Sequence, residues 1–274
     1  MTIKELLDNS FKIYHDRQQT IWLFETVFDV KFKNIIPFED DIPQVDKISF
    51  FLTAVGKLKD GIPLERILQQ TEFCGLEFLL NNETLVPRHE TEGVVDIVKS
   101  IYDYDDGFSF LDLGSGSGNI PVSILSQFPN ATATAVEISK SACVDIFNNA
   151  FIHGIHRRLK IKNKNMFDIN ENEKFDLIVS NPPYIKTADC NILPVKFFDP
   201  LIALDGGKNG LEFYDFIFKN IMENRDDKIP NIILEISPEL VSDVLELTER
   251  YKISGATIEK DLFKRDRFLV YKNN

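Results

Sequence analysis

The chain reads FSFLDLGSGSGNIPVSIL from Phe108 to Leu125, and this stretch decides the fold. Its first residues, 108–113, are mostly apolar and typical of a short buried strand, and the residues from Asn119 onward are typical of a helix. Three glycines lie between them: Gly114, Gly116 and Gly118. Glycines let the backbone turn sharply and come close to a ligand, and the start of a helix offers free N–H groups. A strand, a glycine turn and a helix in this order predict a nucleotide-binding site.

A second predicted strand, residues 131–136, ends in Glu137. Glu137 follows the glycine turn by about 20 residues, the spacing at which a carboxylate meets a ribose diol. The glycines form the pattern G-x-G-x-G, whereas the dinucleotide fingerprint would need a glycine where this chain has Asn119. These features favour S-adenosylmethionine over NAD, because S-adenosylmethionine has no pyrophosphate. Its cationic methionine end would also tolerate Asp112 nearby.

Another motif, Asn181-Pro182-Pro183-Tyr184, follows the apolar residues 175–180. Proline has no N–H and a fixed φ, so the strand ends here and Asn181 is held stiffly at its carboxyl end. The Asn181 side-chain oxygen and the Pro182 carbonyl can accept the two N–H bonds of a planar amide or amine, and the ring of Tyr184 can cover its face. Asn-Pro alone is also a common start of a loop. The whole motif after a strand favours a site that grips an NH2 group.

Together these motifs resemble the class I S-adenosylmethionine-dependent methyltransferases that act on amino or amide nitrogen. Three further stretches narrow the resemblance to the HemK/PrmC family, the glutamine methyltransferases of peptide chain release factors. They are VPRHETE at 86–92, PLIALDGGKNGL at 200–211 and KDLFKRDR at 260–267. The resemblance extends from about Pro63 to Tyr271. The first sixty residues match the family only in position and helical character.

The resemblance implies which residues form the site. The acceptor would be bound by Asn181, Pro182, Pro183, Tyr184, Arg88 and Glu92, with Asn181, Pro182 and Tyr184 acting in catalysis. S-adenosylmethionine would be bound by Asp112, Gly114, Ser115, Gly116, Ser117, Gly118, Glu137, Asn165, Met166, Phe167 and Asn181. No metal is expected. The segment 88–92 also fits a capped helix start with surface charges, and that alternative stays open.

The chain departs from the family pattern at several positions. His89 replaces a proline and Asp199 replaces a glutamate, while Glu137 stands where an aspartate is usual. Asn165 falls where relatives often carry an aspartate that faces the adenine amine, and its amide oxygen can still accept that bond. Met166 falls where some relatives place a tryptophan, and methionine can also pack on a ring. None of these changes removes a group on which the chemistry depends.

Periodicity predicts an α/β protein with two domains. Residues 1–70 form an N-terminal helical domain for substrate docking, with helices near 3–14, 21–27 and 48–58. Residues 71–88 form a linker hairpin, with strands at 73–80 and 85–86 around a turn at Asn81-Asn82. Residues 89–274 form the methyltransferase domain, a Rossmann-like, mostly parallel seven-stranded sheet with helices on both faces. Its strands are expected at 108–113, 131–136, 159–163, 175–180 and 230–236, followed by a late pair at 252–259 and 267–271.

Composition limits the classes of partner. The 274 residues carry a net charge of −12, which argues against direct binding of nucleic acid. Three cysteines without Cys-x-x-Cys spacing, no signal-peptide pattern and no long apolar run predict a cytoplasmic protein that does not enter a membrane. A monomer is expected.

The resemblance implies a class 1 release factor as protein substrate and the glutamine of its Gly-Gly-Gln motif as methyl acceptor. Two alternatives remain open at this point. The first is an adenine-specific nucleic-acid methyltransferase, because the exocyclic amine of adenine fits the same grip. The second is a non-catalytic S-adenosylmethionine-binding module, although such a module has no need of an acceptor grip.

Overall fold

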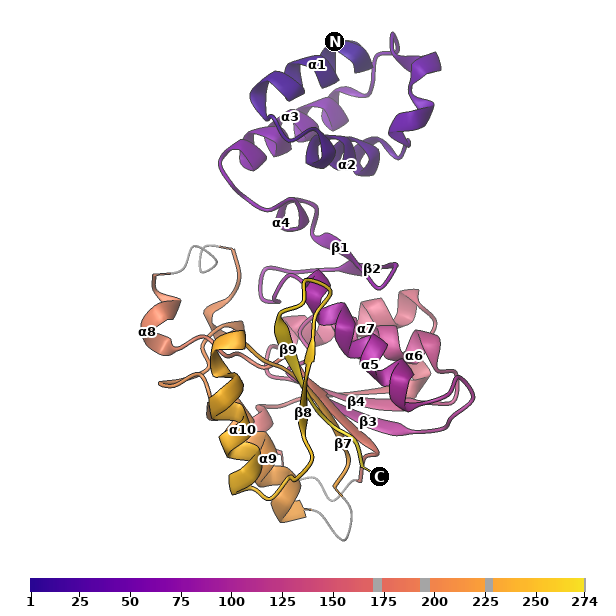
Figure 1. Ribbon diagram of the computed structural model, residues 1–274. Helices are drawn as coiled ribbons and strands as arrows, with labels where there is room; N and C mark the ends of the chain where they lie inside the picture. The colour runs from indigo at the N-terminus through magenta and orange to yellow at the C-terminus, as the bar shows by residue number, and fades with distance from the viewer. Residues whose placement is uncertain (170–173, 193–197, 225–228, 274) are drawn as a thin grey trace. The chain divides into compact units, whose positions relative to one another are not determined.

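The computed structural model describes residues 1–169, 174–192, 198–224 and 229–273 (Figure 1). The chain divides into two compact units, Met1–Gln69 and Gln70–Asn274. Each unit has its own hydrophobic core and is described separately below.

The first unit is helical. Its helices are α1 (Ile3–Ile13), α2 (Arg17–Phe28), α3 (Val45–Lys59) and α4 (Leu64–Leu68), with 3-10 turns η1 (Phe32–Asn34) and η2 (Ile36–Phe38). Thr2 and Glu5 form a capping box that satisfies free N–H groups at the start of α1. Leu23, Phe24 and Phe51 are among the fully buried residues of the core. The three helices expected from the sequence are confirmed.

The second unit is built on a seven-stranded sheet (Figure 1). Its strands are β3 (Ser109–Leu113), β4 (Thr132–Glu137), β5 (Leu159–Asn163), β6 (Leu177–Ser180), β7 (Asn231–Glu235), β8 (Thr257–Lys260) and β9 (Asp266–Tyr271). They are ordered β5-β4-β3-β6-β7-β9-β8. The first five are parallel, and β9 runs antiparallel to β7 and β8. The predicted mostly parallel sheet with a late antiparallel strand is confirmed.

Helices cover both faces of this sheet (Figure 1). One face packs against α5 (Gly93–Ile101), α6 (Asn119–Gln127) and α7 (Lys140–Ile152), and the other against α9 (Glu212–Asn224) and α10 (Val241–Arg250). Within β3, Phe110 belongs to the first core while Leu111 and Leu113 belong to the second. Burial on both faces explains why the strands are continuous apolar runs.

Shorter helical segments connect these elements. They are α8 (Thr187–Cys190), η3 (His89–Glu92), η4 (His156–Arg158), η5 (Met166–Asp168), η7 (Leu201–Ala203) and η8 (Pro238–Leu240). Two of them, η3 and η5, contribute residues to the wall of the candidate site described below.

A two-stranded hairpin opens the second unit. It pairs β1 (Gln70–Phe73) with β2 (Leu76–Leu79), and its turn is Cys74-Gly75. The chain does turn at the predicted Asn81-Asn82, where the Asn81 side chain accepts the Glu83 N–H at 2.6 Å. This turn does not join two strands, so the returning strand predicted at Leu85-Val86 is wrong. Both turn residues have positive φ, 51° for Cys74 and 73° for Gly75. Cysteine seldom adopts this conformation, so the sequence carried only half of the usual signal for such a turn.

Backbone N–H groups that a strand between Asn81 and Val86 would have used for pairing donate to side chains instead. The Asn81 N–H donates to Asp145 of α7 at 2.9 Å, and the Val86 N–H donates to Asp199 at 3.2 Å. Asn149 of α7 accepts the Leu79 N–H at 2.8 Å and donates to the carbonyls of Leu79 and Ser117. Helix α7 thus binds the edge of the hairpin and the glycine turn at once.

Within the described residues, no helix combines the length and the apolar character needed to cross a membrane. The same residues contain no group of three or more His, Cys, Asp or Glu side chains arranged to hold a metal ion. All three cysteines are free thiols.

Candidate active site

The strand order brings three predicted site residues to one edge of the sheet. Gly114 follows β3, Glu137 ends β4, and Asn181 follows β6. Because β4, β3 and β6 are neighbours and run parallel, their carboxyl ends meet at this edge.

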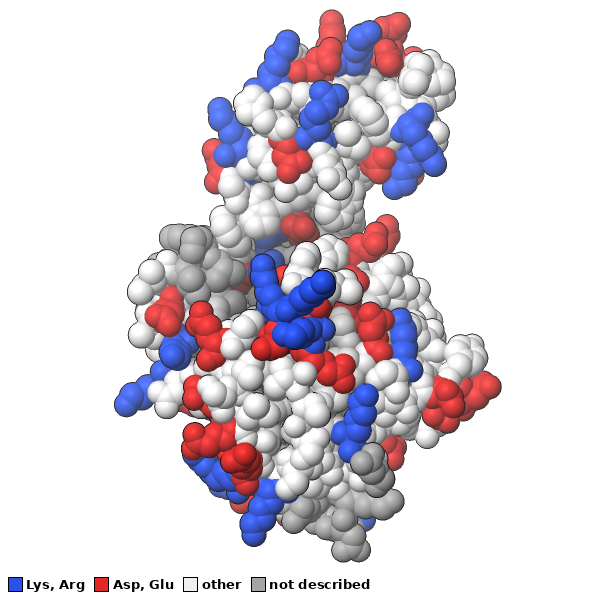
Figure 2. Space-filling view, in the orientation of Figure 1, with Lys and Arg blue, Asp and Glu red and all other residues white. Residues whose placement is uncertain are grey.

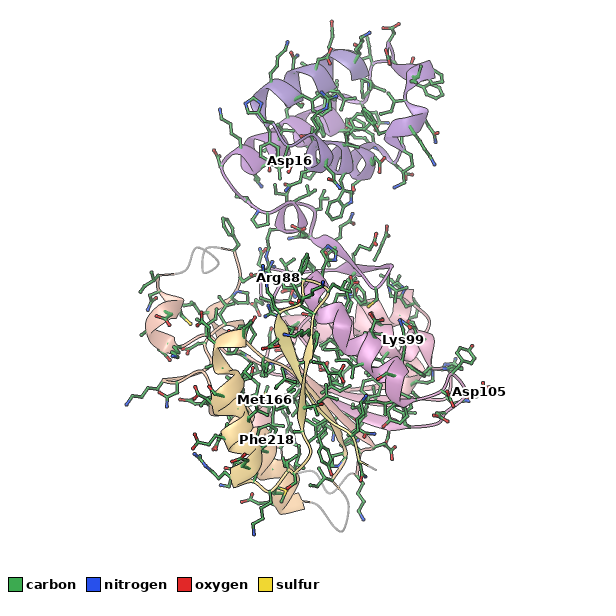
Figure 3. The ribbon with its side chains drawn as sticks, viewed as in Figure 1. Asp16, Arg88, Lys99, Asp105, Met166 and Phe218 are labelled. Carbon is green, nitrogen blue, oxygen red and sulfur yellow. The ribbon has the colours of Figure 1, made fainter. Side chains whose placement is uncertain are left out.

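A cavity lies at this edge. The site residues predicted from the sequence that line this cavity are Arg88, Gly114, Ser115, Gly116, Glu137, Asn165, Met166, Phe167, Asn181 and Pro183. Figure 3 labels two of them, Arg88 before α5 and Met166 after β5. The wall also contains residues that the sequence did not single out, among them Glu83, Thr91, Lys164, Ile202, Ala203 and Phe213. Ile202 and Ala203 belong to the stretch 200–211, whose resemblance to the family could have indicated a place in the site. Nothing in the sequence around Glu83 indicated such a place.

The glycine turn exposes its backbone to the cavity. Gly114 and Gly116 have φ values of 74° and 55°, which only glycine adopts easily. A Cβ added to Gly116 would meet no atom within 4 Å, so this side of the turn is open. Gly118 differs, because a Cβ there would lie 3.1 Å from Ile146 of α7. Ser117 and Gly118 are not in the cavity wall, and Gly118 instead allows α6 and α7 to pack closely.

Glu137 is held in the cavity wall by the backbone. Its two side-chain oxygens accept the N–H groups of Gly116 and Ser139, each at 2.8 Å. Burial raises the pKa of Glu137, while these backbone hydrogen bonds lower it. Each oxygen keeps a free lone pair, so the carboxylate can still accept hydroxyl groups of a bound ligand.

Asp112 directly precedes the glycine turn, is completely buried and is not among the residues that line the cavity. Neither of its side-chain oxygens has a hydrogen-bond partner among the described residues. Burial raises the pKa of Asp112 to about 7, the neighbouring Ser115 hydroxyl acts against the rise, and the Glu137 carboxylate adds to it. A buried carboxylate without partners is costly, which makes this position suited to a cation.

The segment after β5 forms an apolar part of the wall. Asn165 caps η5, and its side-chain oxygen accepts the Phe167 N–H at 3.1 Å. Met166 is buried, while Phe167 is 41% exposed. The Phe167 ring packs against Phe213 and Phe216, with ring centroids 5.1 and 4.9 Å away. Met166 and Phe167 therefore offer flat and adaptable apolar surface to a planar ring.

Asn181 reaches the cavity with its side-chain amide bound on one side. Its Nδ2 atom donates to Thr91 Oγ1 at 3.2 Å, and that hydroxyl donates to Glu235 Oε2 at 2.6 Å. Pro183 also lines the cavity, whereas Pro182 and Tyr184 do not. Tyr184 packs against the core beneath α9 and α10, and burial raises its pKa to about 12. The roles expected of Pro182 and Tyr184 in acceptor binding stay predictions.

Two glycines let a second segment clamp the Asn-Pro-Pro-Tyr loop. The Ile185 N–H donates to the Leu204 carbonyl at 3.0 Å, and the Gly206 N–H donates back to Ile185 at 2.7 Å. A Cβ on Gly206 would lie 2.7 Å from the Pro183 oxygen, and one on Gly210 would lie 2.5 Å from the Tyr184 oxygen. Gly206 and Gly210 are thus required by close backbone contact.

Arg88 and Glu92 have different surroundings. Arg88 lines the cavity and forms an ion pair with the buried Asp199, which also accepts the Val86 N–H. The shorter acid at position 199 therefore still reaches its partner. Glu92 does not line the cavity, because its carboxylate accepts the Cys74 N–H of the hairpin turn at 3.1 Å. The expected role of Glu92 in acceptor binding stays a prediction.

Charge is unevenly distributed over this unit. Figure 2 shows Lys and Arg side chains gathered over the turn between β8 and β9, to which the exposed Lys264 and Arg265 belong. This turn is at the carboxyl edge, because Phe268 at the start of β9 pairs with Glu235 at the end of β7. A chain with a net charge of −12 thus carries a local basic group beside its candidate site.

Comparison with solved structures supports the fold. A methyltransferase from Pyrococcus furiosus matches with a TM-score of 0.51 at 16% identity, over 84% of this chain and all of that one. The human methyltransferase 10 domain containing protein matches with a TM-score of 0.54 at 13% identity, over 72% of this chain and 90% of that one. At such low identity the likeness shows the class I methyltransferase fold alone.

Sequence comparison identifies the family. The family model of the methyltransferase small domain matches residues 98–196. The release factor glutamine methyltransferase of Geobacter sulfurreducens is 41% identical over 73% of this chain and 70% of that protein. The proteins of the same name from Flavobacterium psychrophilum and Bacillus subtilis are 32% and 33% identical, and 78% and 82% of their lengths are covered. This chain therefore belongs to the family of release factor glutamine methyltransferases.

Proposed function

We propose that this chain transfers a methyl group from S-adenosylmethionine to the side-chain amide nitrogen of the glutamine in the Gly-Gly-Gln motif of class 1 release factors. One observation carries the proposal: a single cavity is lined both by the glycine turn with Glu137 and by Asn181. The first group suits a nucleoside, and the second suits an NH2 group. The relatives named release factor glutamine methyltransferase support the choice of acceptor.

Several residues fit S-adenosylmethionine. Glu137 would accept the ribose hydroxyls, and Met166 and Phe167 would pack on the adenine ring. Asp112, whose side-chain oxygens have no partner among the described residues, would hold the cationic methionine end. The open side of Gly116 leaves room for close approach of the ligand to the backbone. When bound, the cofactor supplies an activated methyl group on a positively charged sulfur.

Asn181 prepares the acceptor. An amide nitrogen is a poor nucleophile because its lone pair is shared with the carbonyl group. When the Asn181 oxygen and the Pro182 carbonyl accept its two N–H bonds, electron density shifts toward the nitrogen and the nitrogen is fixed in place. Alignment of reacting groups contributes on the order of 7–11 kcal/mol to catalysis. Water takes the proton that the nitrogen loses.

The first unit would bind the protein substrate. A free glutamine offers little surface, so the release factor must contribute further contacts. Exposed apolar side chains of the first unit are concentrated between residues 36 and 50: Ile36, Phe38, Ile42, Val45 and Phe50. Contiguous exposed apolar patches mark surfaces that bind other proteins, and these residues are proposed to form one.

The decisive experiment is incubation of the chain with isotope-labelled S-adenosylmethionine and a purified class 1 release factor, followed by mass mapping of the product. The proposal expects one added methyl group on the glutamine of the Gly-Gly-Gln motif. Labelling of DNA or RNA but not of the factor would favour an adenine methyltransferase. Binding of S-adenosylmethionine without transfer to any of these would favour a non-catalytic binding module.

A further inference from the structure

We propose that Thr91 and Glu235 act together as positioning residues that fix the Asn181 amide with its oxygen toward the cavity. The inference rests on the proposed function, since it concerns how the acceptor is oriented. Glu235 does not line the cavity, and Thr91, which does, would act here through its bond to Asn181 and not through the substrate. Both would act through Asn181.

The three side chains form a continuous hydrogen-bonded chain from three separate segments. Asn181 follows β6, Thr91 belongs to η3, and Glu235 ends β7. The Asn181 Nδ2 atom is 3.2 Å from Thr91 Oγ1, which is 2.6 Å from Glu235 Oε2. The shorter distance is typical of a hydroxyl that donates to a carboxylate.

The direction of this chain decides which end of the Asn181 amide faces the acceptor. A threonine hydroxyl has one hydrogen, and Thr91 uses it to donate a hydrogen bond to Glu235. The Thr91 oxygen can then only accept, so it must face the NH2 group of Asn181. The Asn181 oxygen is left for the cavity, where it can accept an N–H bond from an amide substrate. The reverse orientation would place two oxygens together without a hydrogen between them.

Burial keeps this hydrogen-bonded chain of Asn181, Thr91 and Glu235, called the relay below, rigid. Thr91 is 1% exposed and Glu235 is 2% exposed. Strand β7 holds Glu235 between β6 and β9, and the Glu235 carbonyl accepts the Tyr214 hydroxyl at 2.8 Å. The Thr91 N–H donates to the Arg88 carbonyl at 3.0 Å. An amide anchored to such fixed neighbours is oriented before the substrate arrives.

The charges around Glu235 make the relay sensitive to pH. Burial raises the pKa of Glu235 to about 7, and Glu90 adds to the rise. The Thr91 hydrogen bond and the charges of Arg267 and Arg88 act against it. Tyr184 and Tyr214 are the other titratable groups that face it, and their raised pKa values keep them neutral in this range. A protonated Glu235 can donate to Thr91, which would reverse the relay and turn the Asn181 oxygen away.

The test compares Thr91→Val, Thr91→Ser and Glu235→Gln with the wild-type chain, at saturating S-adenosylmethionine and release factor. Thr91→Val keeps the shape but removes the hydroxyl, and kcat should fall roughly 10- to 100-fold, as when outer partners of a site residue are lost. Thr91→Ser restores the hydroxyl and should recover most of the rate. The affinity for S-adenosylmethionine should stay unchanged in both variants. Thr248→Val, which removes a buried hydroxyl in α10, is the matched control.

The pH profile supplies the second readout. Wild-type kcat should rise as pH increases through about 7, while Glu235→Gln, which cannot titrate, should show no such step. Equal kcat for Thr91→Val and wild type, or the same step in Glu235→Gln, would overturn the relay. A fall in kcat that Thr91→Ser does not restore would also overturn it. A wild-type chain that methylates no release factor would instead contradict the proposed function.

Discussion

Asn181 and Asp112 illustrate two different tasks at the level of single residues. Asn181 reaches the cavity wall with its amide bound to Thr91, whereas Asp112 is buried directly before the glycine turn without a partner among the described residues. The first side chain would meet the acceptor and the second would meet the cofactor. Their substitution should therefore change different measured quantities.

Replacement of Asn181 by alanine should affect transfer far more than cofactor binding. We expect kcat/KM for the release factor to fall by roughly several hundred-fold, about 4 kcal/mol, because an oriented acceptor atom is lost. Calorimetric titration should show that S-adenosylmethionine still binds with much of its affinity. Turnover at the wild-type rate would rule out the proposed role of Asn181.

Asp112 predicts a pH dependence of cofactor binding. In the ligand-free chain its pKa is about 7, so the carboxylate is mostly protonated at pH 5.5 and increasingly ionised toward pH 7. Only the ionised form attracts a cation, and the amino group of the ligand keeps its charge over this range. The affinity for S-adenosylmethionine should therefore rise about tenfold for each pH unit below 7. Titration calorimetry at several pH values measures it, and Asp112→Asn should remove most of the dependence.

The raised pKa of Asp112 also makes stability depend on pH. Rising pH should increase the affinity for S-adenosylmethionine but decrease the free energy of unfolding. Because the folded pKa lies above the ordinary value, this group stabilises the ligand-free fold fully below about pH 4, and the contribution is lost as pH rises toward 7. The free energy of unfolding of the ligand-free wild-type chain should fall over this range, whereas that of the Asp112→Asn variant should not. Denaturant titrations at fixed pH would measure the difference.

Single residues also show how far sequence reasoning reaches. Gly114, Glu137 and Asn181 could be placed together because each follows or ends a predicted strand, and strand ends meet at one edge. Thr91 and Glu235 could not be connected to Asn181, because their hydrogen bonds link residues far apart in the chain. Ser117 and Gly118 lie outside the cavity wall because they pack against α7, and no local sequence pattern encodes this packing.

At the scale of elements, the loop after β6 depends on the segment that clamps it. Gly206 lies against the backbone of Pro183 and Tyr184, and its N–H donates to Ile185. These contacts hold the Asn-Pro-Pro-Tyr loop at the carboxyl edge. The proline-rich loop is therefore stiff partly through its own sequence and partly through a neighbour.

Replacement of Gly206 by alanine should displace this loop. The added Cβ would lie 2.7 Å from backbone atoms of Pro183 and Tyr184, and backbone cannot move aside as a side chain can. We expect kcat to fall at least tenfold, about 1.4 kcal/mol, with a smaller change in cofactor affinity. Gly107→Ala serves as control, because neither glycine has a positive φ and a Cβ on Gly107 would make only ordinary contacts at 3.8 and 3.9 Å. Equal loss of activity in both variants would contradict displacement of the loop as the cause.

The hairpin shows where element prediction failed. Asn81-Asn82 does begin a turn, but no strand returns from it, and the Asn81 N–H donates to Asp145. The hairpin turn uses Cys74, a residue type that rarely adopts positive φ. Contacts with α7 decide the outcome, and such contacts appear only when the fold is assembled. The helices and the main strands were predictable because their periodicity is local.

At the scale of the whole molecule, the chain combines a helical unit with a methyltransferase unit. The parallel sheet with helices on both faces followed from alternating strand and helix patterns. The boundary between the units followed from a change in periodicity. The task of the helical unit does not follow from its fold, so docking of the release factor remains a proposal to be tested.

Exposed apolar residues of the helical unit supply that test. Phe38 and Ile42 are 51% and 73% exposed, and their joint replacement by serine should raise KM for the intact release factor about tenfold, or 1.4 kcal/mol. The values of kcat and the cofactor affinity should not change. Tyr104→Ser removes an equally exposed ring from the second unit and should leave KM unaltered. An unchanged KM in the double variant would place factor docking elsewhere.

Helix α7 has a practical consequence for work with the isolated enzyme unit. Asp145 and Asn149 are buried, and they bind backbone groups of Asn81 and Leu79. A truncated chain that starts at residue 89 would lose these bonds and would uncover the core into which Phe73 and Phe78 of the hairpin pack, so it should express poorly or precipitate. A chain trimmed to begin at Gln70 keeps the hairpin and is the better starting point for crystallisation.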